Sequence, residues 1–265
     1  MIKITFPFSK CSFVVDSISI IESHIFEKFF LFSKYVKAIE DDVQSIVIRT
    51  NEYDLSVHNT IIGRIHAIKC NSYYDVFKKI TNLIRENTVL SGDVCVLHAS
   101  FVQMNDKGIL LLGESGAGKS TLSAYVHLIN GCECYTDDIV FMNYNTNFGQ
   151  GVSQYINLRE PSLKLLPEQC NAVYDDFIQR YKIILNNCNQ QKVDYIISLN
   201  RQNDIKAKIK PIDDVVNVLI HNMYLPYSLK NNIIAANKLA ANTTVCEMLF
   251  SDLFSACCLL AELGG

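Results

Sequence analysis

The chain has 265 residues, of which 49% are hydrophobic and 19% charged, and its formal net charge is −3. This composition supplies a sizeable core and excludes a largely disordered chain, and the length fits one large domain or two small ones. No run of Lys and Arg occurs, so we expect no nucleic-acid partner. The longer apolar runs fall far short of the roughly 18 residues that suggest a membrane span, so we expect no membrane partner.

The ten cysteines are expected to be reduced thiols. The N-terminal segment, MIKITFPFSK, lacks the basic start and apolar stretch of a signal peptide, so a cytoplasmic location is expected. Cys132 and Cys134 form a CxC pair downstream of His127, but no further ligand stands at a workable spacing for a metal site. We therefore predict no zinc at the cysteines.

The first 90 residues are predicted to form a small α+β module that carries no recognisable chemistry. Ile2–Phe6 alternates apolar and polar residues as a half-buried strand does, and Ser45–Arg49 does so more loosely. Thr60–Lys69 is rich in β-branched residues and is also predicted as a strand. Ser23–Lys37 has helical apolar spacing, with Ser23 as a candidate N-cap.

Residues 91–265 are predicted to form the second domain, preceded by an amphipathic helix over Asp75–Asn87. Its first elements are two strands, Val94–Phe101 and Ile109–Leu112, joined in a hairpin by the turn Asn105–Gly108. The later expected elements are a helix over Leu122–Asn130, strands over Ile139–Met142 and Val193–Leu199, a helix starting at Pro211, and one or two helices over Leu229–Leu263.

The segment GESGAGKS, Gly113–Ser120, fits the phosphate-loop pattern GxxxxGK[ST] at every fixed position, between a predicted strand and a predicted helix. Glycines let backbone N–H groups turn toward phosphates, the helix directs its positive end at them, and the lysine adds a charge for the β- and γ-phosphates. The predicted nucleotide-binding residues are Gly113, Glu114, Ser115, Gly116, Ala117, Gly118, Lys119, Ser120 and Thr121.

Two adjacent carboxylates, Asp137 and Asp138, follow the loop and precede the apolar run Ile-Val-Phe-Met. One of them can hold Mg²⁺ together with the Ser120 hydroxyl, and the other can accept a proton from an attacking hydroxyl. The guanine-reading NKxD pattern of GTPases and the LSGGQ-like stretch of ABC ATPases are both missing. The sequence therefore favours another class of phosphate-loop protein.

His98-Ala99-Ser100, the GESGAGKS loop and the Asp137-Asp138 pair together resemble the catalytic domain of bacterial HPr kinase/phosphorylase. The resemblance implies an α/β fold, namely a phosphate-loop kinase domain of the HPr kinase and phosphoenolpyruvate carboxykinase type with a mixed sheet. It also implies roles for individual residues. Asp138 matches the general base for a seryl hydroxyl, Asp137 the metal-proximal partner, and His98 the histidine near the transferred phosphoryl group.

The chain departs from this family at three points, one of which is an N-terminal region shorter than that of the bifunctional enzymes. Thr121 stands where the HPr enzymes usually have Glu, and their glycine-rich signature after the Asp pair is missing, with Asn157–Pro161 in that region. These departures favour the shorter HPr-kinase-like proteins found with peptide-modification pathways, some of which resemble kinases of a peptide's seryl group. The resemblance further implies ATP and Mg²⁺ as cofactors and a homo-oligomer.

Two arginines, Arg159 beside a proline turn and Arg201 at a strand end, are candidates to offset charge on the γ-phosphate. The function predicted from the sequence is an ATP-dependent kinase that phosphorylates a serine of a peptide or small protein, with Asp138, His98 and Arg159 as catalytic residues. Two alternatives stay open: a small-molecule hydroxyl kinase using the same site, and a nucleotide-binding regulatory protein with little turnover.

Overall fold

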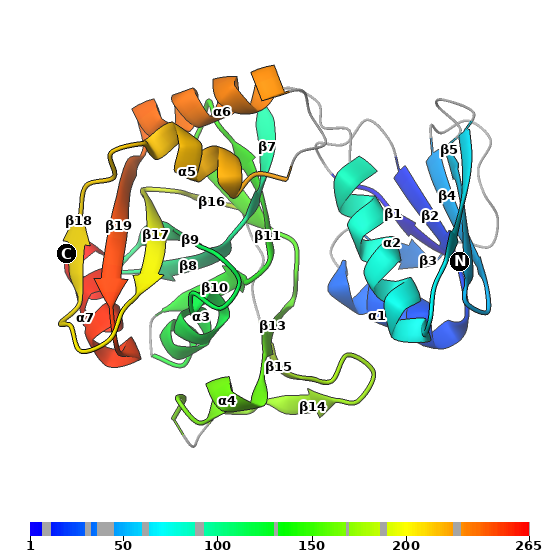
Figure 1. Ribbon diagram of the computed structural model, residues 1–265, viewed down its shortest axis with the longest axis horizontal. Coiled ribbons are helices and arrows are strands. Elements are labelled where there is room, and N and C mark those ends of the chain that lie inside the picture. Colours follow the sequence, from blue (N-terminus) through cyan, green and yellow to red (C-terminus); the bar gives the residue numbers. More distant parts are fainter. Residues whose placement is uncertain are drawn as a thin grey trace. The chain divides into compact units, whose positions relative to one another are not determined.

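The computed structural model describes residues 1–6, 12–29, 33–35, 45–59, 64–87, 93–129, 132–167, 170–185, 190–224 and 229–264. The chain divides into two compact units, Met1–Gly92 and Asp93–Gly265 (Figure 1). None of the described helices is both long and apolar enough to cross a membrane. No cysteine among the described residues is paired in a disulfide.

The N-terminal unit is built on a six-stranded sheet with the strand order β3-β1-β2-β4-β5-β6. Neighbouring strands are antiparallel except β2 and β4, which are parallel. Helices α1 and α2 pack against each other. The elements are β1 (Ile2–Ile4), β2 (Ser12–Asp16), α1 (Ser19–Lys28), β3 (Ser33–Tyr35), β4 (Ser45–Asn51), β5 (Asp54–Asn59), β6 (Arg64–Lys69) and α2 (Tyr73–Asn87).

The helix expected over Ser23–Lys37 is wrong in both bounds, because α1 begins at Ser19 and ends at Lys28. Ser23 does not cap it, since its hydroxyl donates to the carbonyl of Ile20 inside the helix at 3.0 Å. Instead Glu22 in the first turn accepts from the backbone N–H of Ser17 at 3.1 Å. The helical pattern also fails at Ser33–Tyr35, where β3 pairs with β1 through backbone hydrogen bonds, and residues 30–32 and 36–37 of the expected helix lie outside the described part of the chain.

The predicted helix over Asp75–Asn87 is confirmed as α2, which begins two residues earlier. Ser72 accepts from the N–H of Asp75 at 3.1 Å, and the Asp75 carboxylate accepts from the N–H of Asn71 at 3.2 Å. This reciprocal capping fixes the start of the helix. Of the strand expected over Thr60–Lys69, β6 covers Arg64–Lys69, and residues 60–63 lie outside the described part of the chain.

The C-terminal unit contains three sheets in its described residues, with the orders β10-β8-β9-β17-β19-β18, β16-β12-β11-β7 and β13-β15-β14. The first sheet is mixed: β9, β17 and β19 are parallel, and the other neighbours are antiparallel. The strands are β7 (Val94–His98), β8 (Ser100–Met104), β9 (Lys107–Leu112), β10 (Glu133–Thr136), β11 (Ile139–Asn143), β12 (Phe148–Gly151), β13 (Tyr155–Leu158), β14 (Val173–Asp175), β15 (Arg180–Ile184), β16 (Gln190–Lys192), β17 (Tyr195–Arg201), β18 (Lys208–Lys210) and β19 (Thr244–Phe250).

Helices cover both faces of the mixed sheet (Figure 1). In β9, Ile109 and Leu111 pack with α3 and α7, whereas Leu110 and Leu112 pack with α5 and α6. This burial on both sides explains why the strand is a continuous apolar run. The helices are α3 (Lys119–His127), α4 (Glu160–Leu163), α5 (Val215–His221), α6 (Leu229–Asn242) and α7 (Leu253–Gly264).

Two sequence predictions for the C-terminal unit are wrong in ways that matter for topology. The single strand expected over Val94–Phe101 is two strands in two different sheets, since the chain leaves β7 at Ala99 and enters β8. The segment expected to be helical over Leu229–Leu263 contains β19 between α6 and α7. Its seven residues pair in parallel with β17, a contact between distant segments that local periodicity does not reveal.

Smaller corrections concern the ends of elements. The helix expected from Pro211 begins at Val215, where Asp214 accepts from the N–H of Asn217 at 3.0 Å. The strand expected over Val193–Leu199 is β17, and the helix expected from Leu122 already begins at Lys119. The hairpin of β8 and β9 is confirmed.

Candidate functional site

The segment Gly113–Gly118 links the end of β9 to the start of α3 with three glycines at positive φ. The φ angles are 143° at Gly113, 92° at Gly116 and 100° at Gly118. A Cβ at Gly113 would lie 3.0 Å from the Ala117 Cβ and 3.2 Å from the Leu199 carbonyl oxygen, so this position requires glycine for space as well as for conformation. Gly118 offers α3 no side-chain cap, which leaves its first N–H groups available to a ligand.

Lys119 is the first residue of α3, and its side chain is folded back onto the loop. The ammonium donates to the carbonyl oxygens of Gly113 at 2.5 Å and Glu114 at 3.3 Å. Burial lowers the pKa of Lys119, while the carboxylates of Asp138 and Asp137 act in the opposite direction. A buried cation beside two acidic residues is the electrostatic arrangement typical of a functional site.

His98 and Asp138 are brought together where the chain changes sheets twice. The chain passes from β7 to β8 at Ala99 and from β10 to β11 at Asp137-Asp138. Strands β7 and β11 are antiparallel, with His98 opposite Ile139. Asp138 therefore stands beside His98, and its Oδ1 lies 3.9 Å from the His98 Nε2. The sequence pattern contained both residues, but only this register explains their contact.

Asp137 is buried, with 6% of its surface exposed. Its Oδ2 accepts from the backbone N–H of Asn157 at 2.9 Å, which orients the carboxylate. Asn157 lies on β13 of the small three-stranded sheet. In the same sheet the Lys182 ammonium lies 2.6 Å from the Asp175 carboxylate and 4.4 Å above the Tyr155 ring. This buried pair stabilises the sheet that supplies Asn157 and, directly after β13, Arg159.

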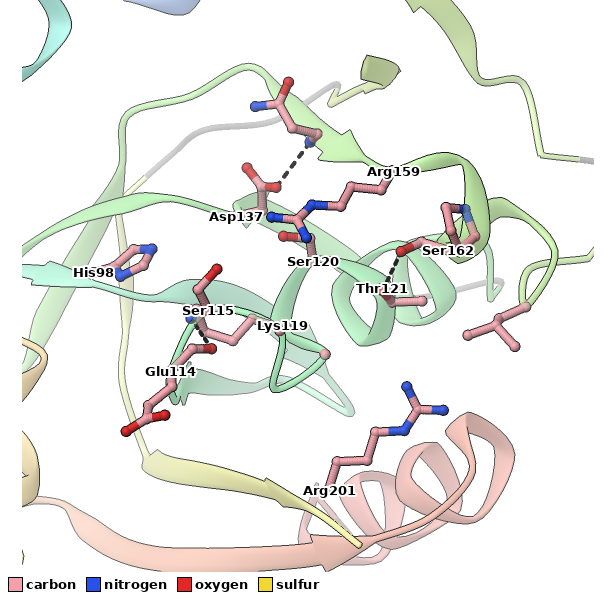
Figure 2. Close-up of a pocket in the computed structure, with 15 residues that line it drawn as sticks. His98, Glu114, Ser115, Lys119, Ser120, Thr121, Asp137, Arg159, Ser162 and Arg201 are labelled. Carbon is pink, nitrogen blue, oxygen red and sulfur yellow. Dashed lines mark hydrogen bonds between the residues drawn. The ribbon is translucent and has the colours of Figure 1, made fainter. Parts of the chain in front are cut away.

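A cavity of about 290 Å³, which we call the loop pocket, is lined by His98, Lys119, Asp137, Arg159 and part of the glycine loop. Figure 2 shows Arg159 extending toward Asp137 and Ser120, and His98 facing the loop from another side. The Thr121 hydroxyl donates to the Ser162 hydroxyl at 3.2 Å, so α3 contacts α4, which follows β13. The lining includes these predicted residues: His98, Glu114, Ser115, Gly116, Gly118, Lys119, Ser120, Thr121, Asp137, Arg159 and Arg201.

Three predicted residues are placed differently. Asp138 does not line the loop pocket itself but contacts His98, which does. Gly113 and Ala117 form the inner part of the loop and line a neighbouring cavity.

The oxygen atoms in the loop pocket fit a nucleotide-bound Mg²⁺. Mg²⁺ takes oxygen ligands and is usually held by one or two protein groups together with phosphates. The Asp137 carboxylate is buried and oriented by Asn157, and Ser120 contributes a hydroxyl from the first turn of α3. The loop glycines and Lys119 provide the complementary positive side for phosphate groups.

Sequence reasoning missed Asn222 as a candidate residue at this site. Its backbone carbonyl accepts from the His98 N–H at 2.7 Å, and its side-chain Oδ1 accepts from the Gly113 N–H at 3.3 Å. It therefore connects the end of β7 to the start of the loop. No motif marks Asn222, because its role depends on the position of α5 against two strands from elsewhere in the chain.

Neither a protein-family model nor a curated protein sequence matches this chain. Among solved structures, it is similar to the HPr(Ser) kinase/phosphatase from Coxiella burnetii. That match covers 63% of this chain and 96% of the other, with 18% sequence identity and a TM-score of 0.34. The likeness is a distant one to a kinase, and it assigns no role to any residue here.

Proposed function

We propose that the C-terminal unit is an ATP-dependent phosphotransferase that moves the γ-phosphoryl group of ATP to a serine hydroxyl of a peptide or small protein. One observation carries the proposal. One pocket combines the glycine loop with Lys119, the buried Asp137 and His98, and the Asp138 carboxylate lies just outside it, 3.9 Å from the His98 Nε2. A protein that only binds nucleotide has no need of this second acidic residue beside the pocket.

In this proposal the loop N–H groups and Lys119 bind the β- and γ-phosphates. Lys119 exchanges its bonds to the Gly113 and Glu114 carbonyls for bonds to phosphate oxygens. Ser120 and Asp137 would hold Mg²⁺, which when bound would supply positive charge to offset the phosphate oxygens. Arg159 and Arg201 line the same pocket and add positive charge around the transferred group.

The transfer step forms one bond and breaks one. The serine oxygen bonds to the γ-phosphorus as the bond from that phosphorus to the bridging oxygen of ADP breaks. The proton of the attacking hydroxyl goes to Asp138, which acts as the general base. The Oδ1 of that carboxylate lies 3.9 Å from the Nε2 of His98, which lines the loop pocket.

The test of this proposal is Asp138→Asn, which keeps the size of the side chain but cannot accept the proton. Transfer of labelled γ-phosphate to serine-containing peptides should fall by about 10²–10⁴-fold, the usual contribution of a positioned base. ATP binding should persist, because the loop and Lys119 are unchanged. Asp106→Asn is the matched control, since Asp106 is exposed on the turn between β8 and β9.

Three other results would contradict parts of the proposal. Equal transfer by the parent and Asp138→Asn would refute the assignment of the base. Transfer only to small hydroxyl compounds would make the protein a small-molecule kinase. ATP binding by the parent without transfer to peptide, serine or water would indicate a nucleotide-binding regulatory protein.

A further inference from the structure

We infer that the acceptor peptide binds in a second cavity next to the loop pocket, an inference that depends on the proposed phosphotransferase activity. This cavity, which we call the strand-end pocket, has a volume of about 700 Å³. It lies beyond the carboxyl ends of the parallel strands β9, β17 and β19, beside α5. Ligands of open α/β sheets bind characteristically in this position.

The two pockets meet at a common wall. His98, Glu114, Ser115, Gly116 and Arg201 line both of them. Lys119, Ser120 and Asp137 line only the loop pocket. If the loop pocket holds the nucleotide phosphates, the shared wall is where a second substrate can approach the terminal phosphate. The Asp138 carboxylate contacts His98 in this wall and is thus close to the expected path of the hydroxyl proton.

The charged residues of the strand-end pocket are two carboxylates, Glu114 and Glu247, and one guanidinium, Arg201. Glu247 is already engaged by the Lys210 ammonium at 2.7 Å and the Asn200 amide at 2.9 Å. No lysine lines the pocket, and Arg201 is its one arginine, so the lining does not suit a polyanion. The chemistry favours a neutral, polar acceptor.

A peptide segment fits this lining better than a charged metabolite. Ser198 is a half-buried hydroxyl on β17, and Asn217 is exposed on α5. An asparagine amide both donates and accepts, as a peptide group does, so such side chains can pair with an extended backbone. The volume of the pocket is within the range of about 300–1,000 Å³ that holds small ligands, which suits a few residues rather than a folded domain.

The strand-end pocket positions the acceptor for the transfer to the serine hydroxyl. The serine oxygen of the bound segment reaches the γ-phosphorus beside the residues that line both pockets. It forms a bond to that phosphorus as ADP leaves, and its proton goes to Asp138. The segment that presents the serine remains in the strand-end pocket. Nucleotide binding and acceptor binding are therefore separable by mutation.

The test variant is Asn217→Trp, whose bulky side chain fills the strand-end pocket. The control is Asn237→Trp, because Asn237 is exposed on α6 and lines neither pocket. His221→Trp, one turn after Asn217, is a second variant that guards against a folding defect in the first. The probes are a mixture of short peptides with a central serine and random flanks, the same mixture with alanine, and free L-serine. Affinity for ATP·Mg²⁺ is measured by calorimetry on every variant.

We expect both pocket variants to lower transfer to the serine peptides by about tenfold or more, because a bulky side chain excludes the segment. Their ATP affinity and that of Asn237→Trp should stay within about twofold of the parent, as for other surface substitutions. Unchanged peptide transfer in both pocket variants would overturn the inference, as would transfer to free L-serine alone. If the parent protein did not bind ATP·Mg²⁺, that result would instead contradict the proposed function.

Discussion

The cavities of the two units differ in whether the charged residues that line them are buried. The N-terminal unit has a cavity of about 770 Å³ lined by residues of β2, β4, β5 and β6, larger than the loop pocket of about 290 Å³. Among its charged lining residues none is buried, and Asp16 lies 3.7 Å from Arg49, with both side chains about half exposed. The loop pocket instead contains a buried lysine and a buried aspartate.

The two cavities therefore differ more clearly in the burial of their charged lining residues than in a size that would favour the loop pocket. Charged groups almost always stay in water unless a partner or ligand compensates their burial. Lys119 and Asp137 are each 6% exposed and both line the loop pocket. A ligand that carries both negative and positive charge, such as a nucleotide with its cation, would complement them. The predictions below test whether this difference in charge burial separates a working site from a surface depression.

The largest effect is expected from Lys119→Met, which should weaken ATP·Mg²⁺ binding by about 10–100-fold because the charge for the phosphates is lost. Burial lowers the pKa of Lys119 in the free protein, and bound phosphates would raise it again. Binding should therefore take up protons in the pH range between these two pKa values, and affinity should fall as pH rises through it.

Calorimetry in buffers of different ionisation enthalpy measures this proton uptake. Lys119→Met should abolish the uptake, whereas Lys208→Met, at an exposed position on β18, should leave both the uptake and the affinity unchanged. Unaltered nucleotide affinity in Lys119→Met would remove the basis for a phosphate site at the glycine loop.

A smaller effect is expected from Asn222→Ala, which takes away the acceptor of the Gly113 N–H. Loss of this bond should loosen the loop and lower kcat/KM for ATP by about fivefold, the equivalent of roughly 1 kcal/mol for one hydrogen bond. Asn237→Ala is a close control. Both asparagines donate to the carbonyl four residues earlier, at 2.9 Å and 2.8 Å, but only Asn222 also accepts from the loop. Steady-state kinetics with an equal loss in both variants would assign Asn222 a structural role only.

Much of the candidate site was accessible from the sequence because it is encoded in local patterns. Gly113–Ser120 is contiguous and its strand and helix neighbours have clear periodicity, so the loop and its context could be predicted together. The Asp137-Asp138 pair was found because two adjacent carboxylates stand at a suitable distance after the loop. His98 was included only through a family resemblance, since a single histidine in an apolar strand carries little signal of its own.

What the sequence did not reveal depends on contacts between distant segments. The division of Val94–Phe101 into two strands follows from pairing with β11 on one side and β10 on the other. The strand β19 was hidden between two helical patterns, and its parallel partner β17 precedes it by about fifty residues in the chain. Asn157 reaches the site through its backbone N–H, which places no demand on the residue type that a motif could record. Asn222 uses its side chain as well as its carbonyl, but it lies more than a hundred residues after the loop residue that it contacts.

The smallest effect is expected at the exposed ion pair of the N-terminal unit, and it completes the comparison. Arg49 and Asp16 lie 3.7 Å apart with side chains 57% and 46% exposed, so water and salt screen their attraction. A double-mutant cycle with Arg49→Ala and Asp16→Ala, measured by urea unfolding, should give a coupling free energy of about 0.2–1 kcal/mol that decreases in high salt. ATP affinity should not change in any of the three variants. A larger coupling that persists in high salt, or a loss of ATP affinity on removing either charge, would mean that this hollow is electrostatically organised too. The burial of charge would then no longer distinguish the two cavities.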